Sequence, residues 1–599
     1  MAVVGTLTDP IWYSNTFIIV NQEQMPSIMP VVSKSNVAAA LSPAVFKKST
    51  SVATLATESS LSLSEASSDD DVPNVETTNK TNCISHQEEV DEYDDVGDPV
   101  ALATSKVQNL IHATVTGPLV MIGFGSIGRG VLPLIERHIH LSDRDSFVVI
   151  EPSDEFVHIL RSRNVRHLRA ALTPQNYEGI LRSLFPGGVD KKTGGMIVNV
   201  SVDVESVAIM ALAQELGVLY IDTVVEAWPG VYFDSTLSNA ERTNYALREK
   251  MLKVGRKYHG GPTAVTCCGA NPGMVSWFMK EALLRIARDT GVEFLQDGNG
   301  TKEGEYSVPK TREEWAKLAM TLGVKGVHIA ERDTQVSSRP KPPGVFVNTW
   351  SVDGFLCEGF QPSELGWGTH EKKLPRGGHR HKHGPGHGIW IDRPGGDTRV
   401  RSWCPGPGPQ MGLLVTHNES LSIADYYTLR DETTGEVVYR PTCHYAYHPC
   451  NDAILSMYET NGAGILPEKK HILTAEEITS GNDDLGVFLY GHAKGAMWYG
   501  SRLSIDETRQ LAPYQNATGL QVTSAIIAGM VYALENPNLG FVEADEMDHV
   551  RCLEVQRPYL GSVECHYTDW TPLKYRINEF EEEDHDNEDP WQFSNFLSR

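Results

Sequence analysis

The sequence predicts an α/β protein, in which a Rossmann-type domain with a parallel sheet precedes an α+β domain with a mixed sheet. Runs rich in β-branched residues alternate with segments of helical period from Pro118 onward. Such alternation is typical of a parallel sheet covered by helices on both faces. The runs that we expect to be strands are PLVMIG (118–123), FVVIE (147–151), MIVNVSV (196–202), VLYIDT (218–223) and AVTCCG (264–269).

The pattern changes after Asn271. Residues 277–291 and 513–535 have the period of helices, and we expect the second of these to pack back on the first domain. Strand-like alternation covers three segments between them, 327–331, 345–355 and 412–429. This part of the chain is therefore predicted to combine a substantial sheet with helices.

Acidic residues are concentrated near the two ends of the chain, whose formal net charge is -25 over 599 residues. Residues 65–98 hold 12 acids and one lysine, and residues 579–599 hold 8 acids and one arginine. The remainder is only mildly acidic, so neither nucleic acid nor an anionic membrane is expected as a partner. Residues 1–115 are rich in Ser, Thr, Val and Ala and then in acids, which predicts a disordered extension.

Cysteine usage indicates an intracellular protein. The nine cysteines show no repeated spacing, so we expect reduced thiols and a cytoplasmic location. The Ser/Thr-rich N-terminus is also compatible with organelle import, although it lacks the arginines of a transit peptide. No apolar run approaches the ~18 residues of a membrane helix.

A glycine-rich loop predicts a nucleotide site. Gly123, Gly125 and Gly128 fit G-x-G-x-x-G between a strand and an amphipathic helix, with Ser126 and Ile127 inside the motif. This loop would place a pyrophosphate at the helix N-terminus. Glu151 ends the next strand, where it can bind the ribose hydroxyls and favours NAD over NADP. An ordinary glycine turn and a site for another adenine nucleotide are the alternatives.

Ligands of such sheets bind beyond the carboxyl ends of the strands. The residues expected at this edge, and so near the cofactor, are Thr173, Ser201, Val202, Asp203, Thr223, Val224, Glu226 and Asn271. Asp203 and Glu226 could instead cap helices, which is a common role for acids after strands.

Seven stretches together resemble one enzyme family. They are VMIGFGSIGRGVLPLIERH, YIDTVVEAW, SNAERTNYALRE, GGPTAVTCCGANPGMVSWF, HIAERDTQ, FVNTWSVDGF and ELGWGTHE. The chain resembles bacterial-type homospermidine synthase, a member of the saccharopine-dehydrogenase-like group, over residues 117–563. The N-terminal extension and a segment at 297–307 are not part of the resemblance.

The resemblance implies an enzyme that joins two putrescines, or spermidine and putrescine, into homospermidine through an imine. Hydride passes from the substrate to NAD and back, so that no net redox change occurs. The family also implies a homodimer. Glu226, Glu331 and Glu358 correspond to carboxylates that bind the polyamine, and Asp203 is expected beside them.

Catalytic roles are likewise implied for certain residues. Trp350 matches the family's tryptophan that holds a cation on its indole face. The attacking amine needs a base, for which Glu358, Glu331 and His417 are candidates, and Asn271 is a further expected catalytic residue. We expect no metal: the loop HRHKHGPGH (379–387) fits no standard zinc pattern.

Two other functions compete with this one. A saccharopine- or carboxyspermidine-type dehydrogenase would show net redox turnover and would need arginines for its carboxylated substrates. An NAD-binding sensor without catalysis is the third hypothesis.

The expected domains follow from the same observations. They are a disordered extension (1–115), an NAD-binding Rossmann domain (116–270), an α+β catalytic and dimerisation domain (271–512), a C-terminal segment on the Rossmann domain (513–577) and an acidic tail (578–599).

Overall fold

The computed structural model describes residues 110–186, 195–292, 308–574, 576 and 585–598. The predicted extension up to residue 109, the segment at 297–307 and the start of the acidic tail at 578–584 lie outside these residues.

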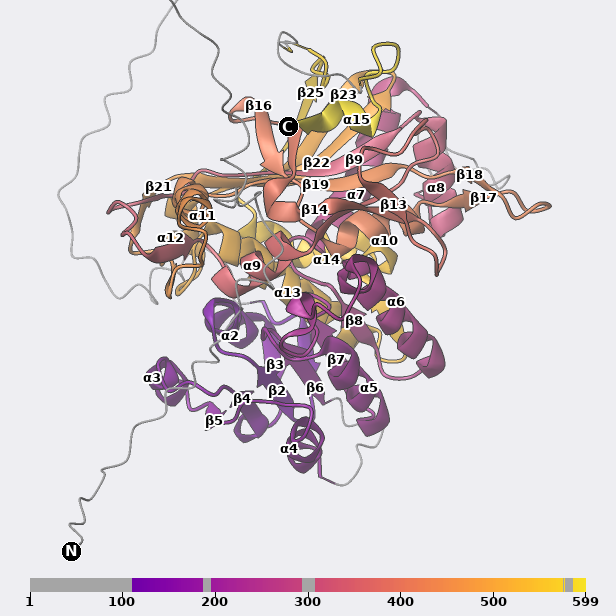
Figure 1. Ribbon diagram of the computed structural model, residues 1–599. Coiled ribbons are helices and arrows are strands. Elements are labelled where there is room, and N and C mark those ends of the chain that lie inside the picture. Colours follow the sequence, from indigo (N-terminus) through magenta and orange to yellow (C-terminus); the bar gives the residue numbers. More distant parts are fainter. Residues whose placement is uncertain (1–109, 187–194, 293–307, 575, 577–584, 599) are drawn as a thin grey trace, which may run out of the picture. The chain divides into compact units, whose positions relative to one another are not determined.

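The first sheet has seven parallel strands in the order β24-β8-β7-β6-β2-β4-β5 (Figure 1). Numbered along the chain from β2, its first six strands have the Rossmann order 3-2-1-4-5-6, and β24 extends that edge. The predicted Rossmann-type parallel sheet is thus confirmed. The strands are β2 (Leu119–Ile122), β4 (Phe147–Ile150), β5 (Arg166–Leu168), β6 (Met196–Asn199), β7 (Leu219–Asp222), β8 (Ala264–Thr266) and β24 (Phe541–Glu543).

Both faces of this sheet are covered by helices. Successive side chains of a strand point to opposite faces, so neighbouring residues of one strand pack in different cores. Met121 packs in a core with α2 (Ser126–His138) and α13 (Ala517–Glu535), whereas Val120 packs in a second core on the other face. The helices of the second core are α4 (Tyr177–Leu184), α5 (Ser206–Leu216) and α6 (Asn244–Gly255). A short helix, α3 (Val157–Ser162), joins β4 to β5.

Contrary to the expectation that no apolar run approaches the length of a membrane helix, α13 is long and apolar enough to cross a membrane, but 78% of its most apolar window is buried inside the fold. It contacts α2 and β7 of the Rossmann domain and also β22 of the second sheet. Its apolar composition is therefore that of a helix buried between two sheets.

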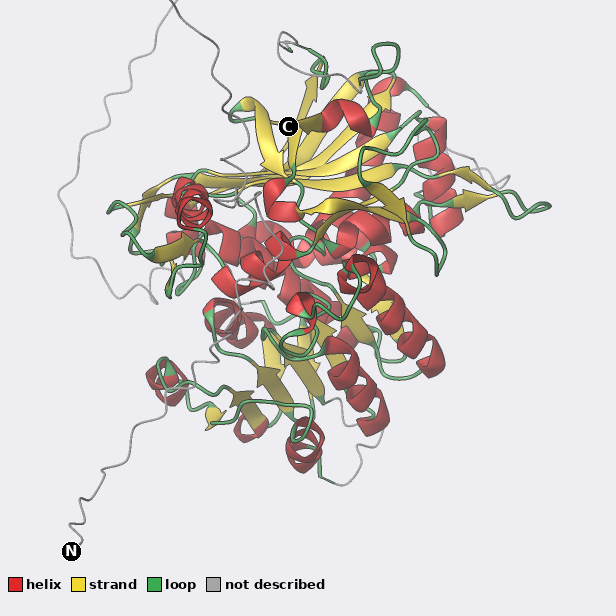
Figure 2. Cartoon of the chain, in the orientation of Figure 1, coloured by secondary structure: helices red, strands yellow, loops and turns green. Residues whose placement is uncertain are grey.

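The second sheet is mixed and has eleven strands, of which β9 and β19 form a parallel pair. Figure 2 shows long strands of this sheet lying beside one another, with helices next to them. Its strands are β9 (Gly326–Asp333), β12 (Pro362–Gly366), β13 (Gly378–Arg380), β14 (Gly388–Pro394), β15 (Arg399–Cys404), β16 (Gly408–Leu413), β19 (Thr442–His448), β22 (Asn482–His492), β23 (Gly495–Ser504), β25 (Ser562–Thr568) and β26 (Leu597–Ser598).

Helices accompany this sheet, and four two-stranded ladders complete the described fold. The helices are α7 (Met274–Thr290), α8 (Arg312–Thr321), α9 (Val352–Phe360), α10 (Asn418–Tyr426), α11 (Asn451–Ala463), α12 (Ile505–Leu511), α14 (His549–Gln556) and α15 (Phe593–Phe596). The ladders pair β1 (Ala113–Val115) with β3 (Ile139–Leu141), β10 (Val336–Ser337) with β21 (Ile478–Ser480), β11 (Val345–Asn348) with β20 (Lys469–Ile472), and β17 (Leu429–Arg430) with β18 (Val437–Tyr439).

Two segments expected to be strands throughout contain helices. After β11 the chain turns into α9, whose N-cap Ser351 accepts a hydrogen bond from the Gly354 amide at 3.1 Å. After β16 it turns into α10, whose N-cap is His417. The expectation was wrong there because short apolar runs fit the strand and helix periods equally well.

The ends of the chain also contribute to the fold. Ala113–Val115, inside the expected extension, form β1. Phe593 and Phe596, inside the expected tail, are 0% exposed, and β26 pairs with β15. The aromatic residues among the acids supply the apolar surface that anchors this segment.

Candidate active site

The predicted site residues converge on one cavity of about 610 Å³. It lies at the carboxyl edge of the Rossmann strands and is closed by residues of the mixed-sheet domain and the start of α13. Every predicted site residue except Gly128 lines it: Gly123, Gly125, Ser126, Ile127, Glu151, Thr173, Ser201, Val202, Asp203, Thr223, Val224, Glu226, Asn271, Glu331, Trp350, Glu358 and His417.

The glycine loop has the geometry of a dinucleotide cradle. Gly123 has a φ of 95°, a region that favours glycine, and a Cβ there would lie 3.0 Å from the Ser201 backbone. A Cβ on Gly128 would collide with the Gly123 carbonyl oxygen. The close contact between the helix and the loop therefore requires glycine at this position. A Cβ on Gly125 would meet nothing within 4 Å, so open space for a ligand adjoins the N-terminus of α2.

Glu151 connects this loop to the end of β4. Its Oε2 accepts a hydrogen bond from the Phe124 amide at 2.8 Å, and its Oε1 accepts one from the Ser153 amide at 2.8 Å. Each carboxylate oxygen can accept a second hydrogen bond, so ribose hydroxyls can still bind. The loop, the open space and this acid together fit NAD.

Asp203 and Glu226 do not cap helices, which settles an alternative that the sequence left open. The N-cap of α5 is Glu205, two residues beyond Asp203. Asp203 itself has a φ of 63°, and burial and the charge of Asp353 raise its pKa. Both acids instead line the cavity.

Glu226 is a buried carboxyl group held by a tyrosine. The Tyr232 hydroxyl donates a hydrogen bond to its Oε2 at 3.0 Å. Burial raises the pKa of Glu226 to about 8, and the charges of Asp203 and Glu358 act in the same direction, while the Tyr232 hydrogen bond opposes them. Near neutral pH this group can therefore take up or release a proton.

Glu331, on β9 of the mixed-sheet domain, is also a buried glutamate that is bound by a tyrosine hydroxyl. Its Oε2 accepts hydrogen bonds from the Tyr445 hydroxyl and from Nδ2 of Asn271, the latter at 3.4 Å. Burial raises the pKa of Glu331 to about 8 against the effect of the Tyr445 hydrogen bond. The site thus contains two proton-accepting glutamates, each bound by a buried tyrosine.

His417 lies between two carboxylates. Its Nε2 is 3.0 Å from Oε2 of Glu358, and its Nδ1 is 3.1 Å from Oε1 of Glu419. Burial disfavours the imidazolium, but Glu358 and Glu419 outweigh this effect and raise the pKa of His417 well above its usual value. The two carboxylates therefore favour the protonated form of His417.

Trp350 lies in the turn between β11 and α9, not within a strand. Its Nε1 donates a hydrogen bond to the Tyr447 hydroxyl at 2.9 Å, and its ring meets that of Phe355 in an edge contact at 5.8 Å. The indole is thereby fixed while it lines the cavity.

Several lining residues were not identified from the sequence. They include Asn244, Thr416, Asn418, Tyr445 and Thr518. Asn244 donates to the Thr416 hydroxyl at 3.3 Å, and Thr416 donates to Oε2 of the buried Glu364 at 3.0 Å. A signal existed only for Tyr445, because Tyr445 and Tyr447 alternate in HYAYH and so share one face of β19.

The charge of the cavity is distinctive. Five acidic side chains line it, those of Glu151, Asp203, Glu226, Glu331 and Glu358. Among the described lining residues none is a lysine or an arginine. The described residues contain no cluster of three or more potential metal ligands from His, Cys, Asp and Glu. The cavity therefore suits a cationic ligand beside the cofactor.

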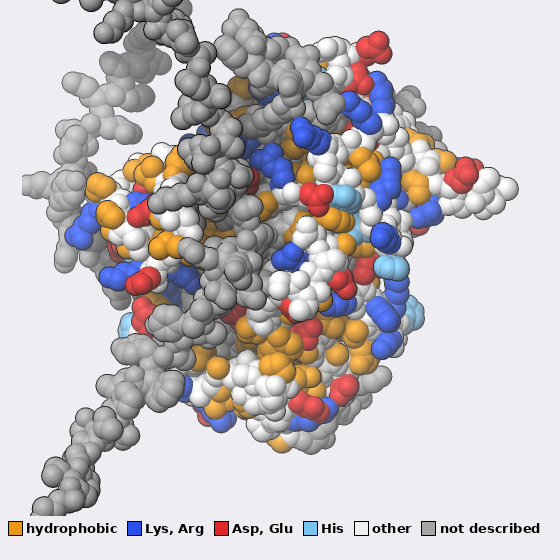
Figure 3. Space-filling model, viewed as in Figure 1, with side chains coloured by type: hydrophobic (Ala, Val, Ile, Leu, Met, Phe, Trp, Pro, Cys, Tyr) orange, Lys and Arg blue, Asp and Glu red, His pale blue; other side chains and the backbone are white. Residues whose placement is uncertain are grey.

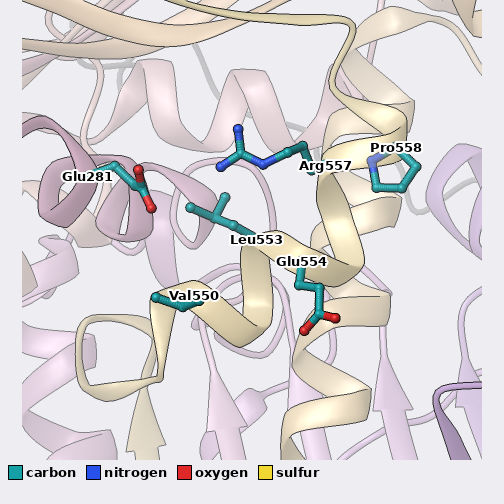
Figure 4. A pocket seen from close by; sticks show the side chains of 6 residues that line it. All are labelled: Glu281, Val550, Leu553, Glu554, Arg557 and Pro558. Atoms are coloured by element: carbon teal, nitrogen blue, oxygen red, sulfur yellow. The ribbon is translucent and has the colours of Figure 1, made fainter. Parts of the chain in front are cut away.

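Two further cavities are lined by residues other than the predicted site residues. One of about 530 Å³ lies between α7 and α14, where Glu281 and Arg557 lie on opposite sides of Leu553 (Figure 4). Another of about 660 Å³ is lined by Lys373, Arg376 and Arg393, with the acid Asp392 beside them.

Comparisons with known proteins agree with this geometry. Residues 119–265 match the saccharopine dehydrogenase NADP binding domain, and residues 269–568 match the saccharopine dehydrogenase C-terminal domain.

Two curated relatives are homospermidine synthases. That of Mesorhizobium japonicum is 56% identical over 490 residues, which cover 82% of this chain and 98% of the relative. That of Blastochloris viridis is 58% identical over 489 residues, which cover 82% and 99%. A homospermidine synthase from Legionella pneumophila, solved in complex with NAD, superposes with a TM-score of 0.71 at 40% identity, covering 81% of this chain and 98% of that one.

Proposed function

The chain belongs to the homospermidine synthase family, and from this premise we propose how its cavity joins two putrescines into homospermidine with release of ammonia. The observation that carries the proposal is the convergence of the glycine loop, Trp350, His417 and the glutamates on one cavity. In this cavity NAD, when bound, supplies an acceptor for the hydride of an amine-bearing carbon and returns that hydride once the new imine has formed.

The proton transfers fall to the glutamates. The second putrescine attacks through a neutral amine, although a free alkyl amine is largely protonated at neutral pH, and ammonia leaves with a proton. A carboxyl group with a pKa of about 8, such as Glu331 or Glu226, can accept the first proton and supply the second. Glu358 and Glu419 favour the protonated form of His417, which makes this histidine the weaker candidate for the base. Glu226 belongs to the cofactor-binding domain, whereas Glu331 lies on β9 of the mixed-sheet domain and is bound by Tyr445, so we assign Glu331 as the base.

Other residues of the cavity bind the cationic groups of the substrate. The Glu358–His417 pair leaves one carboxylate oxygen of Glu358 free of the imidazolium, and this oxygen can accept a hydrogen bond from a substrate ammonium. Trp350 offers an aromatic face to the cationic imine. Asp203 supplies further negative charge on the cofactor side, and Glu226 does so in its ionised form. Stabilisation of the imine cation is the step at which these charges lower the barrier.

The rival functions fit this cavity less well. Saccharopine and carboxyspermidine carry carboxylates, which would require a cationic side chain where the described lining has none. A sensor would not need two buried carboxyl groups poised to exchange protons.

Purified protein incubated with NAD and putrescine tests the proposal. Homospermidine and ammonia should appear in equal amounts while absorbance at the NADH band stays flat. Steady accumulation of NADH would instead indicate a dehydrogenase, and bound NAD without product would indicate a sensor.

We also propose that the protein is a cytoplasmic homodimer that uses putrescine and other polyamines. Leu455 and Tyr458 on α11 are 51% and 56% exposed, and hydrophobic side chains reach the surface around α11 (Figure 3), which supports an interface there. The eight cysteines in the described residues are all unpaired, as in a reducing compartment. Light scattering of the purified protein measures the first property, and fractionation of cells measures the second.

A further inference from the structure

Tyr445 contacts two of the groups in the proposed reaction. Its hydroxyl donates a hydrogen bond to Oε2 of Glu331, and its ring centroid lies 4.4 Å from that of His417. The side chain is 3% exposed and lines the cavity. Tyr447, two residues along the same face of β19, stacks on it with ring centroids 5.3 Å apart.

The direction of the hydrogen bond is fixed. Burial, together with the charge of Glu331, raises the pKa of the Tyr445 hydroxyl well above its usual value, so the hydroxyl stays protonated and donates. A hydrogen bond donated to a carboxyl oxygen favours the charged form of that carboxyl group. At Glu331 it therefore acts against the burial that favours the neutral form.

We infer that Tyr445 is a positioning residue of the reaction: its hydroxyl orients the Glu331 carboxylate and favours the charged, proton-accepting form. This inference rests on the proposed role of Glu331 as the base. Tyr445 acts through Glu331. Removal of its hydroxyl should therefore change the pH range in which Glu331 accepts a proton, while the site itself still forms.

Other ionisable groups also face Glu331. They are Asp333 on β9, Asp483 on β22, Cys404 on β15, His417 and Glu419 at the start of α10, and Tyr447 on β19. A Tyr445→Phe substitution leaves all of these groups in place, so their effects are common to the parent and the variant.

The test is the pH dependence of kcat/KM for putrescine in NAD-loaded enzyme. In Tyr445→Phe the acid form of Glu331 persists to higher pH, so the ascending limb should move up by about one pH unit. Below the limb kcat/KM should fall roughly tenfold, and above it the variant should approach the parent. Replacement of Tyr445 by 3-fluorotyrosine retains the ring and gives a more acidic donor, so the limb should move to lower pH.

Tyr447→Phe is the matched control. It removes a hydroxyl from the same strand face, but that hydroxyl accepts from Trp350 Nε1. Tyr447→Phe can change the size of kcat/KM, but the ascending limb of its pH profile should stay at the parental pH. In a Glu331→Gln background the limb that Glu331 produces is absent, and Tyr445→Phe should then cause no further pH-dependent change in kcat/KM, because the two residues act as one unit.

The outcomes separate the inference from the proposed function. An unmoved limb in Tyr445→Phe, an equal loss at every pH, or an equal shift in Tyr447→Phe would overturn the role of Tyr445 while the parent still makes homospermidine. Absence of homospermidine from the parent enzyme would overturn the proposed function instead. Retained NAD binding and thermal unfolding midpoint show that each variant folds.

Discussion

The Nε2 atom of His417 lies 3.0 Å from Oε2 of Glu358, although the two residues are 59 positions apart in the chain. Glu358 comes from α9 and His417 begins α10, so this pair exists only because both helices border one cavity. Glu419, 0% exposed, binds the other ring nitrogen. The imidazole is thus buried between two acidic side chains that favour its protonated form.

Glu419→Gln should lower the pKa of His417 by about one unit or more, because it removes one of the two charges that favour the imidazolium. NMR titration of the ring, in protein labelled at histidine, measures this change. The raised pKa stabilises the fold fully below the unfolded value of 6.5 and ceases to do so as pH rises through the folded value, so the variant should lose stability mainly on the acidic side. An unchanged ring titration would show that Glu419 does not determine the charge of His417.

Trp350→Phe should reduce turnover by roughly 3- to 30-fold and leave NAD affinity unchanged, because a phenyl face binds a cation less strongly than an indole. Steady-state kinetics and NAD titration measure the two effects. Tyr447→Phe removes only the acceptor of the indole N–H and should have a smaller effect on turnover. Equal turnover in the parent and Trp350→Phe would exclude a cation role for the indole.

Glu151→Ala should weaken NAD binding and reduce the preference over NADP, because the carboxylate would repel a 2′-phosphate and also anchors the Phe124 amide. The ratio of the two dissociation constants is the measurement. Glu155→Ala, which changes an exposed acid four residues further on, is the control and should keep the parental ratio. If the ratio stays the same in Glu151→Ala, Glu151 is not the ribose ligand.

His444 should make the fold sensitive to acid. It is 0% exposed against Phe593 and Phe596, and burial lowers its pKa to about 3. The unfolded chain takes up a proton near pH 6.5 that the folded protein does not, so stability falls as pH drops from 6.5 toward 3.

The thermal unfolding midpoint of His444→Phe should therefore fall less steeply between pH 6.5 and 4 than that of the parent. His259→Asn changes an exposed histidine and serves as the control. Parallel curves for the parent and His444→Phe would show that His444 is not responsible for the acid sensitivity.

Local features made the Rossmann domain predictable. The glycine loop, Glu151 and the residues after each strand belong to elements whose geometry is determined within a short stretch of chain. Asn244 on α6 and Thr416 between β16 and α10 were missed because they reach the cavity only through tertiary packing. Tyr445 was missed although its alternation with Tyr447 marks one face of β19. The family resemblance identified Trp350, Glu358 and His417. The sequence pattern, however, predicted strands where the start of α9 and the whole of α10 are found.

The C-terminal residues show a different limit of sequence reasoning. Averaged charge predicted a tail, whereas Trp591, Phe593 and Phe596 are buried beneath the mixed sheet. Three aromatic side chains outweigh the surrounding acids because each removes a large apolar area from water.

The central claim is that the hydride taken from one diamine returns to the new imine within the same cavity. Putrescine fully deuterated at both amine-bearing carbons is turned over by the NAD-loaded enzyme in an excess of unlabelled NADH, and the product is analysed by mass spectrometry. We predict homospermidine that retains all of its deuterium on both carbons beside the new nitrogen, because the free NADH does not exchange with the cofactor in the cavity. Homospermidine that has lost one deuterium at this linkage, with deuterium accumulating in released NADH, would contradict it.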